Sequence, residues 1–580
     1  MKRHVWLACL GVLIVLAAGI VAFSVQTAGG KVQIRDIRFV GNDGTVMSAL
    51  LFVPKTATAK TPAPGILAVH GYINSRETQS GFAIEFARRG YVVLEMDQTG
   101  HGYSDSPAFA NGFGGPDGLA YLRSLNIVDK ENIGLEGHSM GGWTVLAAAA
   151  TMPDAYRSVV LEGSSTGKPY AAEGNPSWPR NLAVVFSTMD EFSTLMWGVP
   201  RGKDAPNSSK LQAVFGTTGA IEPGRIYGSI EEGTARVLYQ PVTTHPGDHL
   251  SRAAIGYAID WFAKTLSGGT PIPSSNQIWF WKELMTLAGF VGFVVFIVGI
   301  GGLLLSVPVF APIVKAAPVG RPAKGAGLWI GALIATAIPA LTFFPFMGWG
   351  AKLVKGGSFW PQNITSQLAV WALFNGIISL VFFLLWHLIS NRKSGARAAD
   401  YGLTLSWGEA WRTLLYGFSV ILSGVFLLAA ADFLFKIDFR FWVLALKLPS
   451  PVQTKIALSY APVFFLFYLA SSLVLNGQLK FVGKSVAGRY WFSVGTASVG
   501  FLVFLFLEYI PLFAGGTLLT ASQPLNTIIA IQFLPLMIVT SLFSTWFYEK
   551  TGRIYAGALV NALFISWYIA AGQAIHFLVR

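Results

Sequence analysis

Cysteine is nearly absent from this sequence, and charged residues are few. A single cysteine, Cys9, occurs in 580 residues, so no internal disulfide can form. No cluster of cysteine and histidine has the spacing of metal ligands, and we expect neither a metal nor a cofactor. Only 12% of the residues are charged, whereas 53% are hydrophobic, well above the average of a soluble protein. The chain is too long for one domain, and its composition indicates a large apolar part.

The charge is distributed unevenly along the chain. Acidic and basic residues balance in residues 1–269, so the net charge of +13 arises entirely in residues 270–580. The lysines and arginines of this second half lie in loops between long apolar runs, which is the pattern of a membrane protein. A basic protein often binds nucleic acid, but this distribution makes nucleic acid an unexpected partner.

Apolar runs long enough to cross a bilayer occur at the N-terminus and throughout the second half. Lys2 and Arg3 precede the run 5–23, which is typical of a signal peptide or a signal anchor. The small residues near 27–29 match a cleavage site poorly, so we expect an uncleaved anchor at 1–30. After a Gly/Pro linker at 268–278, eight runs predict an all-α transmembrane domain at 279–580: 279–306, 327–349, 367–389, 411–434, 457–475, 491–513, 525–547 and 555–578.

The loops between these runs predict the orientation. Lysine and arginine are more frequent in the four loops 307–326, 390–410, 476–490 and 548–554 than in the loops of the opposite side. This bias and the basic N-terminus both place those loops in the cytoplasm. We therefore expect an integral protein of a bacterial cell membrane, with residues 31–267 and the C-terminal end outside the cytoplasm.

The pentapeptide Gly137-His138-Ser139-Met140-Gly141 carries the main chemical signal. The short apolar run 132–136 before it predicts a buried strand, and the run 142–150 after it predicts a helix. Small residues beside Ser139 allow its hydroxyl to project from a sharp strand-to-helix turn. The backbone N–H of Met140 then faces the position at which an oxyanion would form. The pattern predicts Ser139 as a nucleophile.

Residues 31–267 resemble an α/β-hydrolase domain, which has a mostly parallel sheet with helices on both faces. The segment 64–72 looks like the third strand of that fold and the His-Gly turn after it. By this resemblance, the backbone N–H of Tyr72 is the second oxyanion donor beside that of Met140. The segment 100–104 is similar to the Gly-His-Gly-x-Ser loop that follows the fourth strand of the family.

The catalytic acid is expected after the nucleophile in this family, because the triad occurs in the order Ser, acid, His. Asp190 follows the apolar run 181–187 directly, and it is the expected acid. Glu162, at the end of the preceding predicted strand, is the alternative, because some members carry an acid there.

Two histidines follow the last predicted strand, at 235–240. The segment 247–250 resembles the usual ending of the family, in which a glycine turn, a histidine and an apolar residue lead into the last helix. This resemblance favours His249 as the catalytic base. His245 is the alternative base.

Together these features predict a membrane-anchored serine hydrolase that cleaves an ester or a related acyl bond through an acyl-enzyme. Peptidases and acyltransferases use the same scaffold, and a transporter or sensor with a non-hydrolytic domain is the alternative from another class. The segment 191–233, with Phe192, Met196, Trp197 and Phe215, is the expected specificity element. A small-molecule or lipid-like acyl substrate at the bilayer surface would explain the fusion to a membrane domain.

A second resemblance concerns the C-terminal half. The segment 547–561 looks similar to a terminal segment of the bacterial CAAX-protease-like membrane family. That family carries a histidine where this chain has Asn561, and its paired glutamates have no counterpart in the predicted spans. The resemblance therefore implies a fold that has lost its metal-dependent chemistry.

Overall fold

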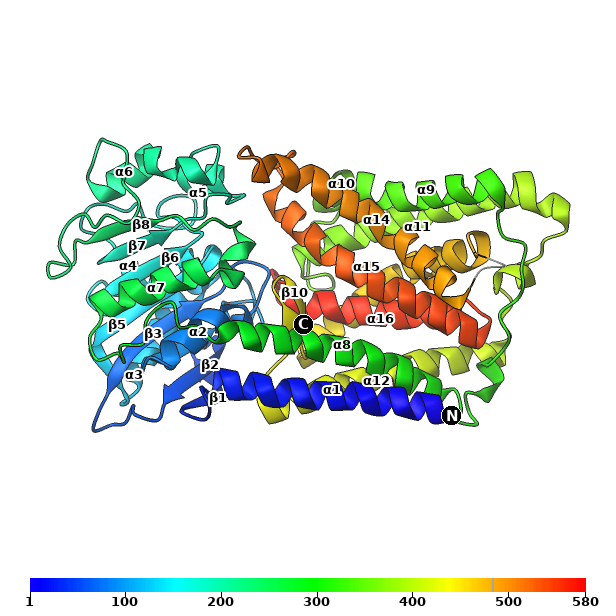
Figure 1. The fold of residues 1–580 in the computed structure, drawn as a ribbon, viewed down its shortest axis with the longest axis horizontal. Coiled ribbons are helices and arrows are strands. Elements are labelled where there is room, and N and C mark those ends of the chain that lie inside the picture. The colour runs from blue at the N-terminus through cyan, green and yellow to red at the C-terminus, as the bar shows by residue number, and fades with distance from the viewer. Residues whose placement is uncertain (482–484, 580) are drawn as a thin grey trace.

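The structure, a computed structural model, describes residues 1–481 and 485–579. Part of the loop predicted at 476–490 lies outside the described residues, as does Arg580. The chain forms two adjoining parts: an α/β region at 32–267 and a helical region at 279–579 (Figure 1). The first helix, α1 (Lys2–Gln26), runs along the helical region (Figure 1). The C-terminal end of this helix leads into the α/β region.

The α/β region is built on a sheet of eight strands in the order β1-β2-β4-β3-β5-β6-β7-β8. The strands from β4 to β8 in this order run parallel, while β1 and β2 are antiparallel to their neighbours. The sheet has the strand pattern expected for the α/β-hydrolase fold. Its strands are β1 (Val32–Val40), β2 (Val46–Pro54), β3 (Ala63–Val69), β4 (Val92–Met96), β5 (Val128–His138), β6 (Ser158–Glu162), β7 (Leu182–Val185) and β8 (Arg236–Tyr239).

Both faces of this sheet are covered, because alternate side chains of each strand point to opposite sides. On β3, Leu67 packs with α3 (Gly115–Ser124) and α4 (Met140–Thr151), whereas Ile66 packs with α2 (Ser80–Ala87) and α7 (Arg252–Thr265). Two further helices, α5 (Ser193–Trp197) and α6 (Ser209–Phe215), lie between β7 and β8 in the chain. The predicted helices on both faces are confirmed.

All eight apolar runs of the second half form helices. Eight described helices, α1 among them, are long and apolar enough to cross a membrane, and α9 with α10 would make a ninth span if taken together. This is consistent with a membrane protein. The eight helices are α1 (Lys2–Gln26), α8 (Trp279–Leu304), α11 (Asn363–Trp386), α12 (Trp407–Phe435), α13 (Pro451–Leu473), α14 (Val486–Phe513), α15 (Pro524–Thr551) and α16 (Tyr555–Gly572). The two helices of the ninth span are α9 (Gly325–Leu341) and α10 (Phe343–Leu353).

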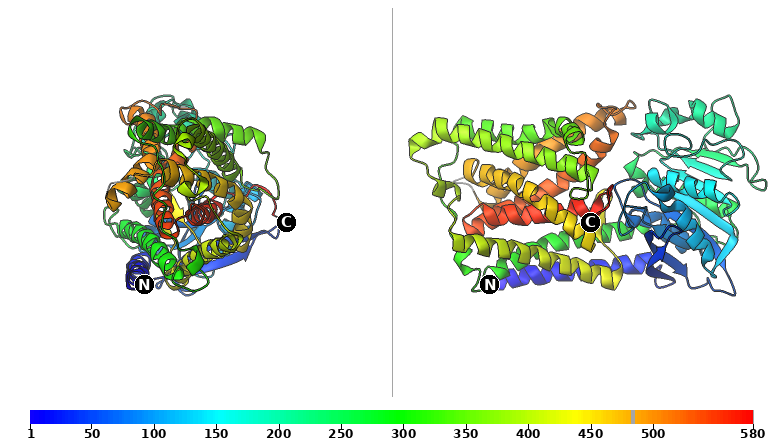
Figure 2. Two further views of the ribbon diagram at one scale, coloured as in Figure 1. Left: turned by 90° about the vertical axis from the view of Figure 1, so that its right-hand side faces the viewer. Right: turned by 180° about the vertical axis from the view of Figure 1, so that it is seen from behind.

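One of these spans is bent and another lies at the centre of the bundle. The axes of α9 and α10 differ by 49°. Pro345 lacks the N–H that would bond to the carbonyl of Leu341, one turn earlier, and its ring crowds that carbonyl, which explains the break. Viewed along the long axis, α16 lies inside the other helices (Figure 2), and 83% of its most apolar stretch is buried.

The first helix packs closely on α8 through glycines of both helices. A Cβ atom on Gly11 would lie 2.6 Å from the backbone nitrogen of Phe296, and one on Gly299 would lie 2.3 Å from that of Ala8. Such close approach is possible only with small residues, as is common where helices pack in membranes. Gln26, at the end of α1, donates a 2.6 Å hydrogen bond to the carbonyl of Phe435 on α12. The N-terminal helix is therefore an integral part of the bundle in this structure.

The segment 268–278 between the two regions is packed rather than free. The Arg89 guanidinium donates hydrogen bonds to the carbonyls of Ile272, Pro273 and Asn276, at 3.0, 2.6 and 2.9 Å. The backbone N–H of Thr270 donates in turn to the carbonyl of Arg89 at 2.7 Å. A Gly/Pro composition had indicated a linker, but one buried arginine holds this segment against the α/β region.

Buried charges join the two regions. Glu77, before α2, lies against Arg76 and against Lys447 and Arg440 of the loop between α12 and α13. Burial alone would raise the pKa of Glu77, but Lys447, Arg76 and Arg440 together hold it well below its usual range. Removing one partner would leave an uncompensated buried charge, which is strongly destabilising. The network therefore fixes the α/β region on one end of the helical region.

Candidate active site

Ser139 occupies a strained turn between β5 and α4. Its φ of 54° and ψ of −120° lie where residues with a Cβ atom are rarely found. A Cβ atom on Gly137 would lie 2.2 Å from the carbonyl oxygen of Gly141, and one on Gly141 would lie 2.1 Å from that of Val69. Only glycine fits at either position. The small residues that flank Ser139 are therefore required by the turn itself.

Neighbouring groups hold the backbone of this turn in place. The N–H of Ser139 donates a 2.8 Å hydrogen bond to the carbonyl of Glu162, at the end of β6. The hydroxyl of Ser164 donates a 2.7 Å bond to the carbonyl of Ser139. The side chain of Ser139 remains partly exposed and lines a cavity.

Met140 and Tyr72, the two residues expected to donate to an oxyanion, lie beside Ser139. Met140 is the first residue of α4, so no carbonyl within the helix can accept from its N–H. The turn after β3 passes over Ser139, because a Cβ atom on Gly71 would lie 3.2 Å from the Cβ of Ser139. Tyr72 follows directly, and both Tyr72 and Met140 line the cavity beside Ser139. The structure thus brings together the three residues that the sequence singled out for attack and oxyanion binding.

Asp190 is paired with His245. Its Oδ2 lies 2.8 Å from Nδ1 of His245, and its Oδ1 accepts a 2.7 Å hydrogen bond from the N–H of Phe192. His245 lines the cavity together with Ser139. Gly163 makes room for the imidazole, since a Cβ atom there would lie 3.0 Å from Nδ1 of His245. This geometry favours the histidine that the sequence left as the alternative base.

His249 also lines the cavity but has a different partner. Its Nε2 lies 3.1 Å from Oε1 of Gln79, at the start of α2. Its ring packs on His138, with the ring centroids 4.1 Å apart. His245 caps the N-terminal end of a short 3₁₀ helix, Pro246–Leu250, and His249 lies within that helix. Both histidines line the cavity. Of these two histidines, His245 alone has a hydrogen bond to Asp190 among the described residues.

The environment of this pair keeps the imidazole neutral. Burial lowers the pKa of His245 to about 4, against a smaller opposing effect of Asp248. Burial also raises the pKa of Asp190, and the nearby charge of Asp248 raises it further, while the hydrogen bond from Phe192 opposes the change. A general base must be unprotonated before it can act, and His245 meets this condition at neutral pH.

Glu162, the alternative acid, has no such partner. Both of its carboxyl oxygens are buried without a hydrogen bond among the described residues. Burial, followed by the charges of Asp248 and Glu136, raises the pKa of Glu162 well above its usual range. A carboxyl that makes no hydrogen bond to a histidine cannot hold its imidazole in place. The arrangement favours Asp190 over Glu162.

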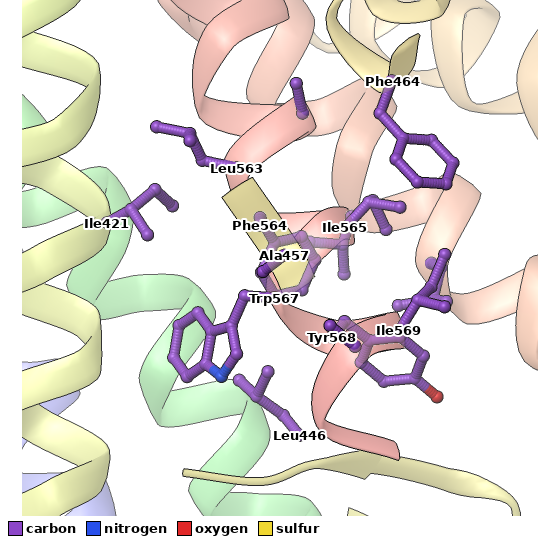
Figure 3. Packing of buried hydrophobic residues seen from close by; sticks show 14 of the residues in the cluster. Ile421, Leu446, Ala457, Phe464, Leu563, Phe564, Ile565, Trp567, Tyr568 and Ile569 are labelled. Atoms are coloured by element: carbon purple, nitrogen blue, oxygen red, sulfur yellow. The ribbon is translucent and has the colours of Figure 1, made fainter. Parts of the chain in front are cut away.

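The cavity extends beyond the α/β region into the bundle. Its volume is about 410 Å³, and residues of both regions line it. Figure 3 shows Ile565, Tyr568 and Ile569 on the side of α16 that faces Phe464 of α13, and all four line this cavity. Of the four residues expected to set specificity, Phe192 and Met196 line the cavity, whereas Trp197 and Phe215 are buried in the core of the α/β region.

Several residues at this site carried no signal in the sequence. Trp442, between α12 and α13, lines the cavity and donates a 2.6 Å hydrogen bond from its indole N–H to the carbonyl of Pro246, beside His245. The hydroxyl of Tyr72 lies 2.8 Å from Nε2 of His576, beyond the last helix. Both contacts join segments hundreds of residues apart, so no local pattern could predict them.

The resemblance to the CAAX-protease-like family stays a prediction. Asn561 is fully buried in α16 and donates a 2.8 Å hydrogen bond to the carbonyl of Thr540 on α15. Among the described residues, no group of three or more His, Cys, Asp or Glu side chains could hold a metal ion. The amide at Asn561 serves helix packing in this structure.

Comparison with known proteins agrees with the fold of the α/β region. Residues 64–267 match the family described as the alpha/beta hydrolase fold. With the sheet order above, this match establishes the α/β-hydrolase fold in this part of the chain and supports a hydrolase.

Two curated proteins share a shorter segment. Uncharacterized proteins Rv2715 of Mycobacterium tuberculosis and Mb2734 of Mycobacterium bovis are each 31% identical over 106 residues, which is 17% of this chain. The match spans only 28% of the length of these relatives.

Solved structures of esterases are also similar to the α/β region. The Pyrococcus furiosus esterase Pf2001 is 16% identical, with a TM-score of 0.31, and the match covers 42% of this chain and 96% of the esterase. Acetyl xylan esterase 1 from Thermoanaerobacterium sp. is 16% identical, with a TM-score of 0.27, over 41% of this chain and 84% of the esterase. These are likenesses of fold.

Proposed function

We propose that residues 31–267 form a serine hydrolase that cleaves an acyl ester, with Ser139 as nucleophile, His245 as base and Asp190 as the residue that orients the base. The hydrogen bond between Asp190 and Nδ1 of His245 supports this assignment above all, because it leaves Nε2 of His245 free to act in the cavity that Ser139 lines. The strained turn at Ser139 and the adjoining N–H groups add to it.

The proposed reaction begins when Nε2 of His245 accepts the proton of the Ser139 hydroxyl. The oxygen then attacks the acyl carbon, and the backbone N–H groups of Tyr72 and Met140 stabilise the negative oxygen of the tetrahedral intermediate. The bond to the leaving alcohol breaks as His245 returns the proton to it. The acyl group remains on Ser139.

Water completes the cycle. His245 removes a proton from the water molecule, whose oxygen attacks the acyl carbon of the acyl-enzyme. The ester bond to Ser139 breaks, the hydroxyl of Ser139 regains the proton from His245, and the acid leaves. Asp190 keeps the imidazole in the tautomer with its proton on Nδ1 throughout, and stabilises the imidazolium that forms.

A fluorophosphonate probe tests this proposal, because it reacts with an activated serine regardless of the natural substrate. The wild-type protein in membranes should be labelled, and Ser139→Ala should not. Asn181→Ala is not a suitable control, since that side chain braces β7 through its bonds to the carbonyls of Arg157 and Ile230. Ser177→Ala, in an exposed turn, is the matched control and should be labelled like wild type. An unlabelled wild type, beside a labelled reference hydrolase, would refute the enzymatic function.

We further propose that the protein is integral to a bacterial cell membrane, with α1 retained as an anchor and the α/β region outside the cytoplasm. The close packing of α1 on α8 supports retention of α1. The α/β region and the end of the chain lie on the same side of the bundle, since the N–H of Ala108 donates to the carbonyl of Ile575 at 2.7 Å. This agrees with an even number of spans after residue 278, whichever way the protein faces.

A further inference from the structure

The cavity at Ser139 has one open arm and one enclosed arm. On the open side it is lined by three half-exposed aromatic or aliphatic side chains, Phe109, Tyr170 and Leu195, which are 44%, 49% and 46% exposed. On the other side it is lined by side chains of the helical region that are almost fully buried, such as Leu368 and Phe464, each 3% exposed. One continuous space therefore connects the serine to the inside of the bundle.

The enclosed arm follows the helices into the bundle. The α13 helix begins at the α/β region, because Gln453 donates a 2.7 Å hydrogen bond to the carbonyl of Gly102. Phe467 of the same helix lines the cavity fourteen residues later, which corresponds to about 20 Å along the axis. On α15 the lining residues extend from Leu525 to Met537, which is about 18 Å. The lining residues of α13 and α15 thus indicate similar depths for the enclosed arm.

The walls of this arm are almost entirely apolar. Trp371, Phe464, Phe533 and Met537 line it, with further aliphatic residues of α11, α15 and α16. No Asp, Glu, Lys or Arg is among the described residues that line the cavity. The hydroxyl of Tyr568 is already bonded to Gln532 at 2.6 Å. A long space without charged lining residues disfavours a charged group and suits a flexible hydrocarbon.

We infer that the enclosed arm holds the acyl chain of the substrate, which makes the substrate a long-chain acyl ester of the kind found in lipids. This inference rests on the proposed function, since it places the ester carbonyl at Ser139. The alcohol must leave and water must enter before the acyl-enzyme is hydrolysed, so the alcohol lies in the open arm. The acyl chain stays in the enclosed arm until the last step.

The inference predicts how rate depends on chain length. Each methylene that enters an apolar cavity contributes up to about fourfold in kcat/KM. The protein in lipid nanodiscs, where no detergent competes for the cavity, should hydrolyse p-nitrophenyl dodecanoate with a higher kcat/KM than the butyrate. Esters of acetate with longer alcohols should show no such increase.

Variants that fill the arm provide the decisive comparison. Leu368→Trp and Ile565→Trp place an indole in the arm, and each should lower the dodecanoate-to-butyrate ratio of kcat/KM at least tenfold. Ile377→Trp is the matched control, since Ile377 lies on α11 with Leu368 but is 47% exposed on the outside of the bundle. It should keep the wild-type ratio.

The outcomes separate this inference from the proposed function. If both filled variants are labelled by a fluorophosphonate and hydrolyse butyrate, but keep the wild-type ratio, the arm does not hold the acyl chain. A preference for long alcohols instead of long acyl groups would also overturn the inference. The rate at which fluorophosphonates label the wild-type protein gives a test that needs no variant. A long-alkyl fluorophosphonate should react faster than a short-alkyl one, and equal rates would overturn the inference. An unlabelled wild type would refute the proposed function, and this inference with it.

Discussion

The hydroxyl of Tyr509 on α14 donates a 3.0 Å hydrogen bond to Oε1 of Glu191, the residue next to Asp190. The other carboxyl oxygen of Glu191 accepts a 2.7 Å bond from the backbone N–H of His245. A helix of the bundle therefore reaches the backbone of the proposed base through one intermediate side chain. Burial, and then the charge of Asp190, raises the pKa of Glu191 to about 8. The Glu191 carboxyl in this buried contact is therefore largely neutral at pH 7.

Tyr509→Phe should lower kcat for a short ester about threefold to tenfold, because the loss of one hydrogen bond costs about 1 kcal/mol in the placement of His245. KM should change little, since Tyr509 does not line the cavity among the described residues. Tyr555→Phe is the matched control, as it removes a 2.8 Å bond to the carbonyl of Leu403 away from the site. Equal rates in the two variants would exclude a positioning role for Tyr509.

His245→Ala should reduce kcat/KM for p-nitrophenyl butyrate by at least about a thousandfold, as expected for loss of a triad base. His249→Ala removes the hydrogen bond with Gln79 and the ring contact with His138, and it should cost less than about tenfold. Thermal unfolding of both variants would show that the fold is intact. The reverse ranking would return the role of base to His249, as the resemblance of 247–250 to the family implies.

The pH profile of kcat/KM should show an unusually low acid limb. The base acts when neutral, and burial lowers the pKa of His245 to about 4, so activity is retained between pH 5 and 6 and falls as the pH drops through about 4. An exposed histidine would instead lose activity near pH 6.5. Intrinsic tryptophan fluorescence at each pH serves as the control for unfolding. A limb at 6.5 or above would show that the base is not buried as described.

Gly141→Ala should abolish labelling by a fluorophosphonate and lower the melting temperature. The new Cβ would lie 2.1 Å from the carbonyl oxygen of Val69 and 2.6 Å from that of His70, and neither backbone atom can yield without displacing β3. Such overpacking costs about 3 kcal/mol. Gly219→Ala, where a Cβ would meet nothing within 4 Å, should behave as wild type. A labelled and stable Gly141→Ala would contradict the tight turn at Ser139.

The orientation in the membrane can be tested with single cysteines, because Cys9 is the only native one. In a Cys9→Ser background, Asp154→Cys places a thiol on the α/β region, where the side chain is 87% exposed. A maleimide that cannot cross membranes should label it in intact spheroplasts. Lys393→Cys, exposed in the loop after α11, should be labelled only after lysis. The opposite pattern would place the α/β region in the cytoplasm.

Much of the α/β region could be predicted from local patterns. Buried parallel strands are short apolar runs, so β3 to β8 could be predicted from the sequence, as could α4, α7 and the turn at Ser139. The histidines were harder to separate. His245 precedes a short 3₁₀ helix, His249 lies within it, and both line the cavity. Which of them bonds to Asp190 therefore depends on how the chain after β7 packs on that helix. The resemblance of 247–250 to other family members carries no information about this packing.

The enclosed arm of the cavity could not be predicted. Phe464 and Phe533 lie in apolar runs where an aromatic side chain normally packs in a core, and many neighbours do so. Which aromatic residues leave a space depends on how α11, α13, α15 and α16 cross, and on the position of the α/β region above them. The segment 268–278 illustrates the same limit, since its Gly/Pro composition predicts a linker but does not reveal the hydrogen bonds from Arg89 that hold it. In both cases, contacts with residues far away in the sequence determine the structure.

The pairing of α1 with α8 has a mechanical consequence. The α/β region is an insertion between two helices that lie in contact along their length, so it is tethered at two neighbouring points (Figure 1). A body held at one point can swing and rotate, whereas two adjacent tethers leave it mainly a rocking motion about the line that joins them. The ion pairs of Glu77 with Arg440 and Lys447, and the hydrogen bond between Tyr72 and His576, oppose this remaining motion. Ser139 is thereby held in line with the part of the cavity that lies inside the bundle.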